Sequence, residues 1–304
     1  MSSQIQPYHI PVLLNQVLRF LEPLPGKIFI DATLGLGGHT KELISRMNDQ
    51  GAVYGIETDE RNLISAKKNL AGFKNIHFIH DNFENLEEIG TRVLKQEGRI
   101  DGIFFDLGLS SPHIEEGQRG FSFQREGPLD MRFNQTQGIL AADIVNTYSL
   151  EQLTQIFQTY GEEKFSYRIA KHIIQLRRRN KFKTTTQLKT AVEECIPHRY
   201  SSAHYSKIHP ATRIFQALRI AANREIEVLG SGLNGALNVI SKHGRIVVIS
   251  YHSLEDRVVK NFFRDNKKNG LVKILTKKPI RPDREEMMQN RRSRSAKLRA
   301  AENN

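Results

Sequence analysis

The sequence predicts an α/β protein whose parallel, doubly wound sheet is interrupted by a mostly helical domain. Short apolar runs alternate with helical patterns over residues 27–106, which is typical of consecutive βαβ units. The alternation then stops, and residues 150–195 place apolar side chains at helical spacing without a strand pattern. It returns with an expected helix over 213–229 and an apolar strand over 244–250.

The elements of the first part are expected in a simple order. Each strand is a short apolar run, and a pattern of helical period separates it from the next. A segment rich in Gly, Ser and Pro follows over residues 110–135 and is expected to form an extended functional loop. The expected strands cover residues 27–31, 52–57, 76–80 and 100–106, and the expected helices cover 40–47 and 61–70.

This organisation predicts two domains, one of them in two pieces. Residues 1–112 and 213–304 are expected to form the sheet domain, and residues 113–212 the mostly helical inserted domain. The end of the chain, from about residue 280, is rich in Arg and Lys and poor in apolar residues. We therefore expect a basic, partly mobile C-terminal tail.

Composition excludes several classes of protein. The 304 residues include a single cysteine, Cys195, so an internal disulfide and a Cys-rich zinc site are excluded and a reducing compartment is expected. No Cys/His cluster occurs, so no metal site is expected, and Cys195 is interpreted as a packing residue. There is no signal-peptide pattern and no apolar run near the roughly 20 residues of a membrane helix. The expected location is the cytoplasm, away from membranes.

The net charge of +12 is concentrated in two segments. Residues 164–213 contain 12 Lys and Arg against 2 acids, and residues 260–304 contain 14 against 5, so the remainder is acidic. Solvated basic faces would explain either segment alone. Two basic segments on an acidic body favour a polyanionic partner, and nucleic acid first.

A glycine-rich loop follows the first expected strand. Gly37 and Gly38 lie in this loop, which opens the first helix, where backbone amides favour a negatively charged group. The second strand ends at Glu57, where a carboxylate can accept hydrogen bonds from ribose hydroxyls. The combination predicts an adenosine-containing ligand, whereas an ordinary strand–helix turn would not require the acid.

Two features favour S-adenosylmethionine (AdoMet) over NAD. The dinucleotide fingerprint needs a third small residue where this chain has Thr40, and Asp31 at the end of the first strand suits the ammonium of an amino-acid ligand. Phe83, after the third strand, could hold an adenine ring or equally belong to the core. Asp106 ends the fourth strand, and an acid there is hard to explain by packing.

Seven longer motifs, in order along the chain, resemble those of the RsmH (MraW) family of bacterial small-subunit ribosomal RNA cytosine-N4 methyltransferases. They are YHIPVLL (8–14), DATLGLGGH (31–39), DLGLSSP (106–112), RGFSF (119–123), GPLDMR (127–132), HPATR (209–213) and YHSLEDR (251–257).

The resemblance implies AdoMet as methyl donor and, as acceptor, the exocyclic amine of one cytosine in the decoding region of 16S rRNA. Glu57 stands where Asp is common in the family, and His113 stands where Gln often follows Ser-Ser-Pro. The family's AdoMet contacts would fall on Gly37, Gly38, His39, Glu57, Phe83, Asp106 and His113.

Catalysis is expected to depend on aligning the amine with the methyl group. The tetrapeptide Asp/Asn-Pro-Pro-aromatic of many amino-methyltransferases is absent, and the segment from Asp106 to Pro112 replaces it. We hypothesise that Asp106 and the Ser110, Ser111 and Pro112 segment orient the amine, although Ser-Ser-Pro also suits a plain helix start.

Contacts with RNA are expected from three places. Arg132 ends a loop, residues 121–132, that is a candidate lid, and Arg177, Arg178 and Arg179 would contact phosphates. Tyr251 and His252 could stack on or bind the target base, although a structural role at a helix start explains most of that motif.

Three alternative functions stay open on the sequence. They are an NAD(P)-linked oxidoreductase, a non-enzymatic RNA-binding factor, and a methyltransferase for DNA or another rRNA site. The expected partner is 16S rRNA, in an assembled 30S particle rather than as free RNA, because the two basic segments suggest a large RNA surface. Monomer and homodimer remain equally compatible with the sequence.

Overall fold

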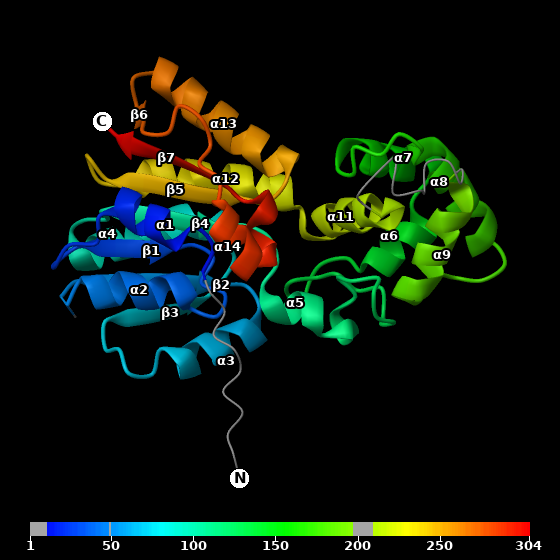
Figure 1. Ribbon diagram of the computed structural model, residues 1–304, viewed down its shortest axis with the longest axis horizontal. Helices are drawn as coiled ribbons and strands as arrows, with labels where there is room; N and C mark the ends of the chain where they lie inside the picture. The colour runs from blue at the N-terminus through cyan, green and yellow to red at the C-terminus, as the bar shows by residue number, and fades with distance from the viewer. Residues whose placement is uncertain (1–10, 49, 197–208) are drawn as a thin grey trace, which may run out of the picture. The chain divides into compact units, whose positions relative to one another are not determined.

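The computed structural model describes residues 11–48, 50–196 and 209–304, apart from the side chain of Ser111. The chain forms two compact units (Figure 1). The first consists of Met1–Gly108 and Ile226–Asn304, and the second of Leu109–Glu225. The second boundary therefore lies about a helix later than the expected residue 213.

The first unit is built on a seven-stranded sheet of order β3-β2-β1-β4-β5-β7-β6. Strands β1 to β5 run parallel, and β7 runs antiparallel to both of its neighbours. This confirms the predicted Rossmann-like α/β class. The strands are β1 (Ile28–Asp31), β2 (Ala52–Glu57), β3 (Ile76–His80), β4 (Gly102–Asp106), β5 (Arg245–Ser250), β6 (Val272–Ile274) and β7 (Lys297–Asn303).

The expected C-terminal tail is wrong, because the end of the chain is an internal strand. Strand β7 pairs with β5 along six residues, and its middle residues are buried. Its charges are neutralised locally, since Arg299 Nε donates to Asp256 at 2.6 Å and Glu302 accepts from Arg245 at 3.0 Å. Burial of paired charges makes an Arg- and Glu-containing strand possible where the sequence predicted a mobile tail.

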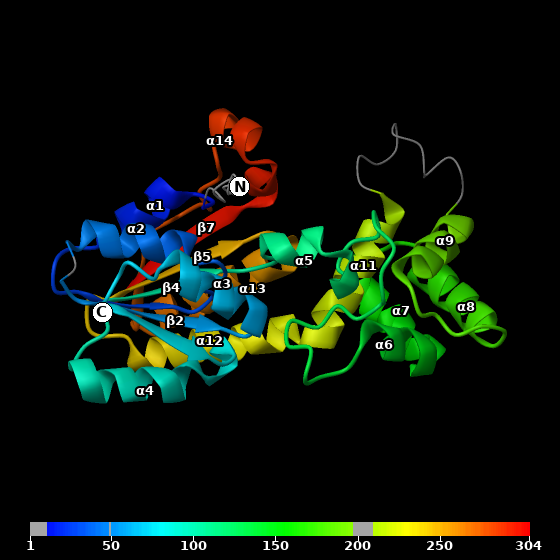
Figure 2. The same ribbon diagram turned by 90° about the horizontal axis from the view of Figure 1, so that it is seen from below.

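Helices cover both faces of this sheet, because alternate residues of each strand point to opposite sides (Figure 2). The helices of this unit are α1 (Leu14–Leu21), α2 (Gly38–Arg46), α3 (Glu60–Asn69), α4 (Leu86–Glu97), α12 (Glu225–Val239), α13 (Ser253–Lys268) and α14 (Arg284–Gln289). One core contains Ile28 and Ile30 of β1 with residues of α4, α12 and α13, and the other contains Phe29 with residues of α1, α2 and α3.

The second unit is helical and has its own core. The helix expected over 213–229 is in fact two helices that break at Arg224, whose φ of 51° is left-handed. Cys195 lies in this core, and burial raises the pKa of its thiol to about 11. Within the described residues of this unit the helices are α5 (Ser111–Glu115), α6 (Ala141–Thr147), α7 (Leu150–Thr159), α8 (Ser166–Arg177), α9 (Thr185–Cys195) and α11 (Pro210–Asn223).

The candidate lid is fastened to the second unit. Phe121, Leu129 and Met131 belong to its core. The Arg119 side chain is 2% exposed, and its Nη2 donates to the carbonyl oxygens of Arg132 and Phe133 at 2.9 and 3.0 Å. The loop is therefore a packed part of this unit rather than a free flap.

Among the described residues, no helix is both long enough and apolar enough to cross a membrane.

Candidate active site

Three acidic side chains end neighbouring strands of the sheet. Asp31 is the last residue of β1, Glu57 of β2 and Asp106 of β4. Strand β1 lies between β2 and β4, and all three are parallel. Their carboxyl groups therefore line one edge of the sheet, the edge at which open α/β sheets bind ligands.

Asp31 anchors the glycine loop to helix α2. Its Oδ2 accepts a hydrogen bond from the Thr40 hydroxyl at 2.7 Å, and its Oδ1 accepts one from the Thr33 backbone N–H at 3.2 Å. Burial raises the pKa of this carboxyl group. The predicted role, holding a ligand ammonium, would use the remaining lone pairs of the same oxygens.

The glycine loop has the backbone that a ligand cradle needs. Gly35 and Gly37 have φ values of 54° and 84°, in the left-handed region that favours glycine, and Gly38 is the first residue of α2. Glu57 Oε2 accepts from the Gly35 N–H and Oε1 from the Asp59 N–H, both at 2.8 Å. Burial raises the Glu57 pKa to about 7. These residues fit an adenosine-containing cofactor.

We expect Gly37→Ala to weaken AdoMet binding at least about tenfold. The added Cβ would lie 2.7 Å from Leu70 Cδ1, and the left-handed backbone itself costs roughly 1–2 kcal/mol in a residue with a Cβ. Isothermal titration measures the affinity. Gly98→Ala is the matched control, because Gly98 is also left-handed (φ 76°) but a Cβ there meets nothing within 4 Å. Equal AdoMet affinities of the two variants would contradict a role of this turn in binding.

Asp106 is held by residues from three separate elements. The Tyr251 hydroxyl donates to its Oδ1 at 2.7 Å, and its backbone N–H donates to Thr33 Oγ1 at 2.6 Å. Its Oδ2 lies 3.6 Å from Nδ1 of His39 on α2. Burial raises the Asp106 pKa to about 7, the Tyr251 hydrogen bond opposes this shift, and Glu255 adds to it.

The contacts of His39 determine its tautomer. Its Nε2 lies 2.9 Å from the Val12 carbonyl oxygen, and this bond requires a proton on Nε2. Burial lowers the pKa of the ring, so the ring is neutral at pH 7 and Nδ1 presents a lone pair to Asp106 Oδ2.

Phe83 opens a 3-10 turn after β3 and is partly buried. Its ring packs edge-on against Phe105, with centroids 5.6 Å apart, and a Cβ on Gly232 of α12 would lie 2.6 Å from it. Packing between the sheet and α12 therefore explains Phe83 at least as well as a ligand contact does.

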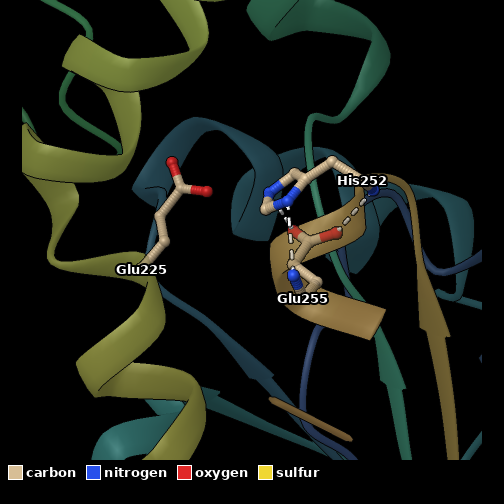
Figure 3. A group of neighbouring side chains, drawn as sticks. All are labelled: Glu225, His252 and Glu255. Carbon is tan, nitrogen blue, oxygen red and sulfur yellow. Dashed lines mark hydrogen bonds and ion pairs between the residues drawn. The ribbon is translucent and has the colours of Figure 1, made fainter. Parts of the chain in front are cut away.

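The motif after β5 starts helix α13. Nδ1 of His252 accepts the Glu255 N–H at 3.3 Å, and the buried Glu255 carboxylate accepts the His252 backbone N–H at 3.2 Å (Figure 3). The same carboxylate accepts the Tyr251 backbone N–H at 2.7 Å. Nε2 of His252 lies 3.1 Å from Glu255 Oε1 without the geometry of a hydrogen bond. Figure 3 also draws Glu225, whose carboxylate accepts two hydrogen bonds from Arg219. The structure thus gives His252 a capping role.

The second unit carries the other predicted catalytic residues. Ser110 caps the short helix α5, its Oγ lies 3.0 Å from His113 Nδ1, and Pro112 lies in the first turn. The His113 ring is 4% exposed and lies beside Phe121 and Phe133. The side chain of Ser111 lies outside the described part of the structure.

The arginines predicted to contact RNA differ in whether other protein groups already bind them. Arg132 forms a two-bond ion pair with Asp130, at 2.7 and 3.1 Å, so this pair holds its guanidinium within the loop. Arg177 is half-buried and donates to the Val145 carbonyl oxygen at 2.8 Å. Arg178 and Arg179 are exposed.

Sequence reasoning missed three residues that position this site or its surroundings. Thr33 holds the Asp106 backbone, Glu255 holds the Tyr251 backbone, and Glu286 of α14 accepts the Leu13 N–H at 2.7 Å beside the Val12 carbonyl that holds His39. Glu286 and Leu13 are 273 residues apart, so no local sequence signal could reveal their contact.

Curated relatives match this chain along its length. The ribosomal RNA small subunit methyltransferase H of Halothermothrix orenii is 44% identical over 97% of this chain and 98% of its own. The protein of that name from Dictyoglomus thermophilum is 44% identical over 99% and 98%. A solved rRNA methylase from Streptococcus thermophilus has a TM-score of 0.41 and 15% identity, covering 99% of each chain.

A family model described as the MraW methylase family matches residues 6–304. This match confirms the family resemblance, and with it AdoMet as the cofactor. The chain belongs to the MraW methylase family, and it is a methyltransferase of the small subunit methyltransferase H type.

Proposed function

We propose that this protein transfers a methyl group from AdoMet to the exocyclic N4 amine of a cytidine in the decoding region of 16S rRNA. The relatives named above act, by their names, on small-subunit ribosomal RNA. The observation that carries the proposal is the Asp106 carboxyl group at the end of β4, which Tyr251 holds in place. A carboxylate there can accept a hydrogen bond from an amine that is about to be methylated.

Methylation of N4 requires that the amine be aligned with the methyl group and that a nearby group accept the amine proton. The N4 lone pair is conjugated with the cytosine ring, so the amine is a weak nucleophile. AdoMet supplies an activated methyl group when it is bound. Asp106 would accept a hydrogen bond from the amine and so draw electron density onto N4. It would then take up the proton that N4 loses after methylation.

Burial and Tyr251 act on Asp106 in opposite ways. Burial favours the protonated form and raises the pKa of Asp106 to about 7, and the Tyr251 hydroxyl stabilises the carboxylate form. A pKa near the working pH is the condition for efficient proton transfer. Tyr251 is thus proposed to orient Asp106 rather than to stack on the target base.

The remaining site residues are proposed in the roles that the family suggests. Cofactor contacts are assigned to Asp31, Gly37, Gly38, His39, Glu57, Phe83, Asp106 and His113, and the Ser110–Pro112 segment would help to orient the amine. We propose the second unit as the RNA-binding domain. Its exposed Arg178 and Arg179 suit phosphates, and the assembled 30S particle is the preferred substrate.

One assay tests reaction, cofactor and substrate together. Labelled AdoMet is incubated with 30S particles, free 16S rRNA and DNA, each lacking the modification, and the nucleosides are separated and identified by mass. We expect label in N4-methylcytidine from the 30S sample. Label in another nucleoside would contradict the proposed acceptor, and equal labelling of free rRNA would contradict the preference for the particle.

The pH dependence of kcat tests the role of Tyr251. Since burial raises the Asp106 pKa to about 7 and the carboxylate is the active form, kcat should rise with pH through about 7 and then level off. Tyr251→Phe removes a hydrogen bond to the carboxylate, worth about 1.5–3 kcal/mol, so the rise should move up by roughly 1–2 pH units.

The matched control is Tyr54→Phe, which removes the hydroxyl that donates to Glu97 elsewhere in the same unit. Its pH profile should equal that of the unaltered protein. If Tyr251→Phe also leaves the pH of the kcat rise unchanged, the Asp106 pKa does not determine that rise.

A further inference from the structure

We infer that a pocket on the first half of α8 binds one nucleotide of the RNA, with its phosphate on Arg168 and Lys171. The inference rests on the proposed rRNA substrate and adds a place where the second unit contacts it. The pocket lies within that unit and has a volume of about 360 Å³, at the lower end of the range for small-ligand pockets. It is lined by Tyr167, Arg168, Lys171, His172, Gln175, Glu194 and Cys195.

The pocket has an excess of positive charge. Its one acid, Glu194, is engaged by His172, whose Nε2 lies 2.8 Å from a carboxylate oxygen. The neighbouring acid, Glu193, is engaged by His209 and Lys189. Arg168 and Lys171 are exposed, and in the part of the chain that the structure describes neither forms an ion pair with an acid.

Helix stability does not explain the cation at Arg168. Arg168 is the third residue of the twelve-residue helix α8, whose first turn contains no acid. A cation there opposes the positive end of the helix dipole, whereas an anion would be attracted by the dipole and the side chain together. The opposite holds for Arg177 in the last turn, where a cation stabilises the helix. The structure therefore favours the first half of α8 over its last turn as a phosphate site.

Tyr167 favours a nucleotide over a simple anion. Its side chain is 58% exposed, and Tyr167, Arg168, Lys171 and Gln175 share one face of the helix. An exposed aromatic ring beside phosphate-binding cations is the arrangement with which proteins hold unstacked bases of single-stranded RNA. Gln175 adds a side-chain amide that can hydrogen-bond to a base edge.

A double substitution tests the phosphate contacts. The R168Q/K171Q protein should bind small-subunit rRNA about tenfold more weakly at 0.15 M salt, and its log affinity against log salt should be less steep by about 0.7, the contribution of one neutralised single-strand phosphate. Filter binding at several salt concentrations measures both quantities. AdoMet affinity and thermal stability should not change.

The matched control is R92Q/K95Q. Arg92 and Lys95 are also exposed cations three residues apart on a twelve-residue helix, α4 in the first unit, and the double substitution removes the same charge. This control should keep the RNA affinity and salt dependence of the unaltered protein. Equal losses in the two double variants would overturn the pocket in favour of a general charge effect, and a lower thermal stability of R168Q/K171Q would overturn it in favour of a structural role.

Tyr167→Leu tests the base contact separately. It should lower RNA affinity at least about fivefold with an unchanged salt dependence, because stacking is lost and no charge is removed. Tyr167→Phe should retain the affinity, and a loss equal to that of Tyr167→Leu would overturn stacking. A failure of the proposed function would be seen in a different measurement. The unaltered protein would then label a nucleoside other than N4-methylcytidine, whatever the RNA affinities of the variants are.

Discussion

Replacing Asp106 with asparagine should lower kcat for methyl transfer by roughly 10²–10³, with little change in stability. The loss follows from removing the proposed proton acceptor, since a positioned general base contributes about 10²–10⁴. The fold should tolerate the change, because asparagine has the same shape and its amide oxygen can still accept from the Tyr251 hydroxyl. Single-turnover kinetics with saturating AdoMet and 30S particles measures the chemical step.

Glu57→Gln is the matched control for this substitution. Glu57 is also a carboxyl group at a strand end, also with a pKa raised to about 7 by burial, but it binds the glycine loop. We expect Glu57→Gln to weaken AdoMet binding while single-turnover kcat at saturating AdoMet stays within a fewfold of normal. An Asp106→Asn enzyme that transfers methyl groups at the normal rate would exclude proton acceptance by Asp106.

The strand pattern of the first unit could be read from the sequence, because β1, β2, β4 and β5 are largely buried apolar runs. Strand β7 could not be predicted from the sequence. Its residues, from Lys297 to Asn303, include an arginine and a glutamate whose charges are neutralised by Asp256 and Arg245, residues brought close only by the fold. Pairing between distant residues is not visible as a local pattern.

The candidate site divides in the same way. Asp31, Glu57 and Asp106 were predictable as neighbours, because parallel topology brings the ends of their strands to one edge. The hydrogen bond from Tyr251 to Asp106 spans 145 residues and has no local signal, so the sequence offered for Tyr251 only a contact with the target base or a structural role at a helix start. The pairing of Arg132 with Asp130 spans only two residues, and that signal was present in the sequence.

The largest effect on stability is expected at Arg119. Replacing it with methionine should lower the unfolding free energy of the second unit by roughly 3 kcal/mol. The buried guanidinium is a donor for the carbonyl oxygens of Arg132 and Phe133, and a buried acceptor left without its donor costs about 1–3 kcal/mol. Urea unfolding measures the change. AdoMet affinity should persist, because the proposed cofactor residues other than His113 lie in the first unit.

Arg125→Met separates this contact from a general effect of removing an arginine from the same loop. Arg125 also donates to a carbonyl oxygen, that of Glu115, but it is exposed, so water can replace its hydrogen bond. Its loss should cost less than about 0.5 kcal/mol of unfolding free energy.

Because Arg119 holds residues 119–133 against the core of the second unit, Arg119→Met should also slow methyl transfer to RNA more than it weakens AdoMet binding. Similar unfolding energies for the two variants would show that the core residues Leu129 and Met131 hold this loop without Arg119.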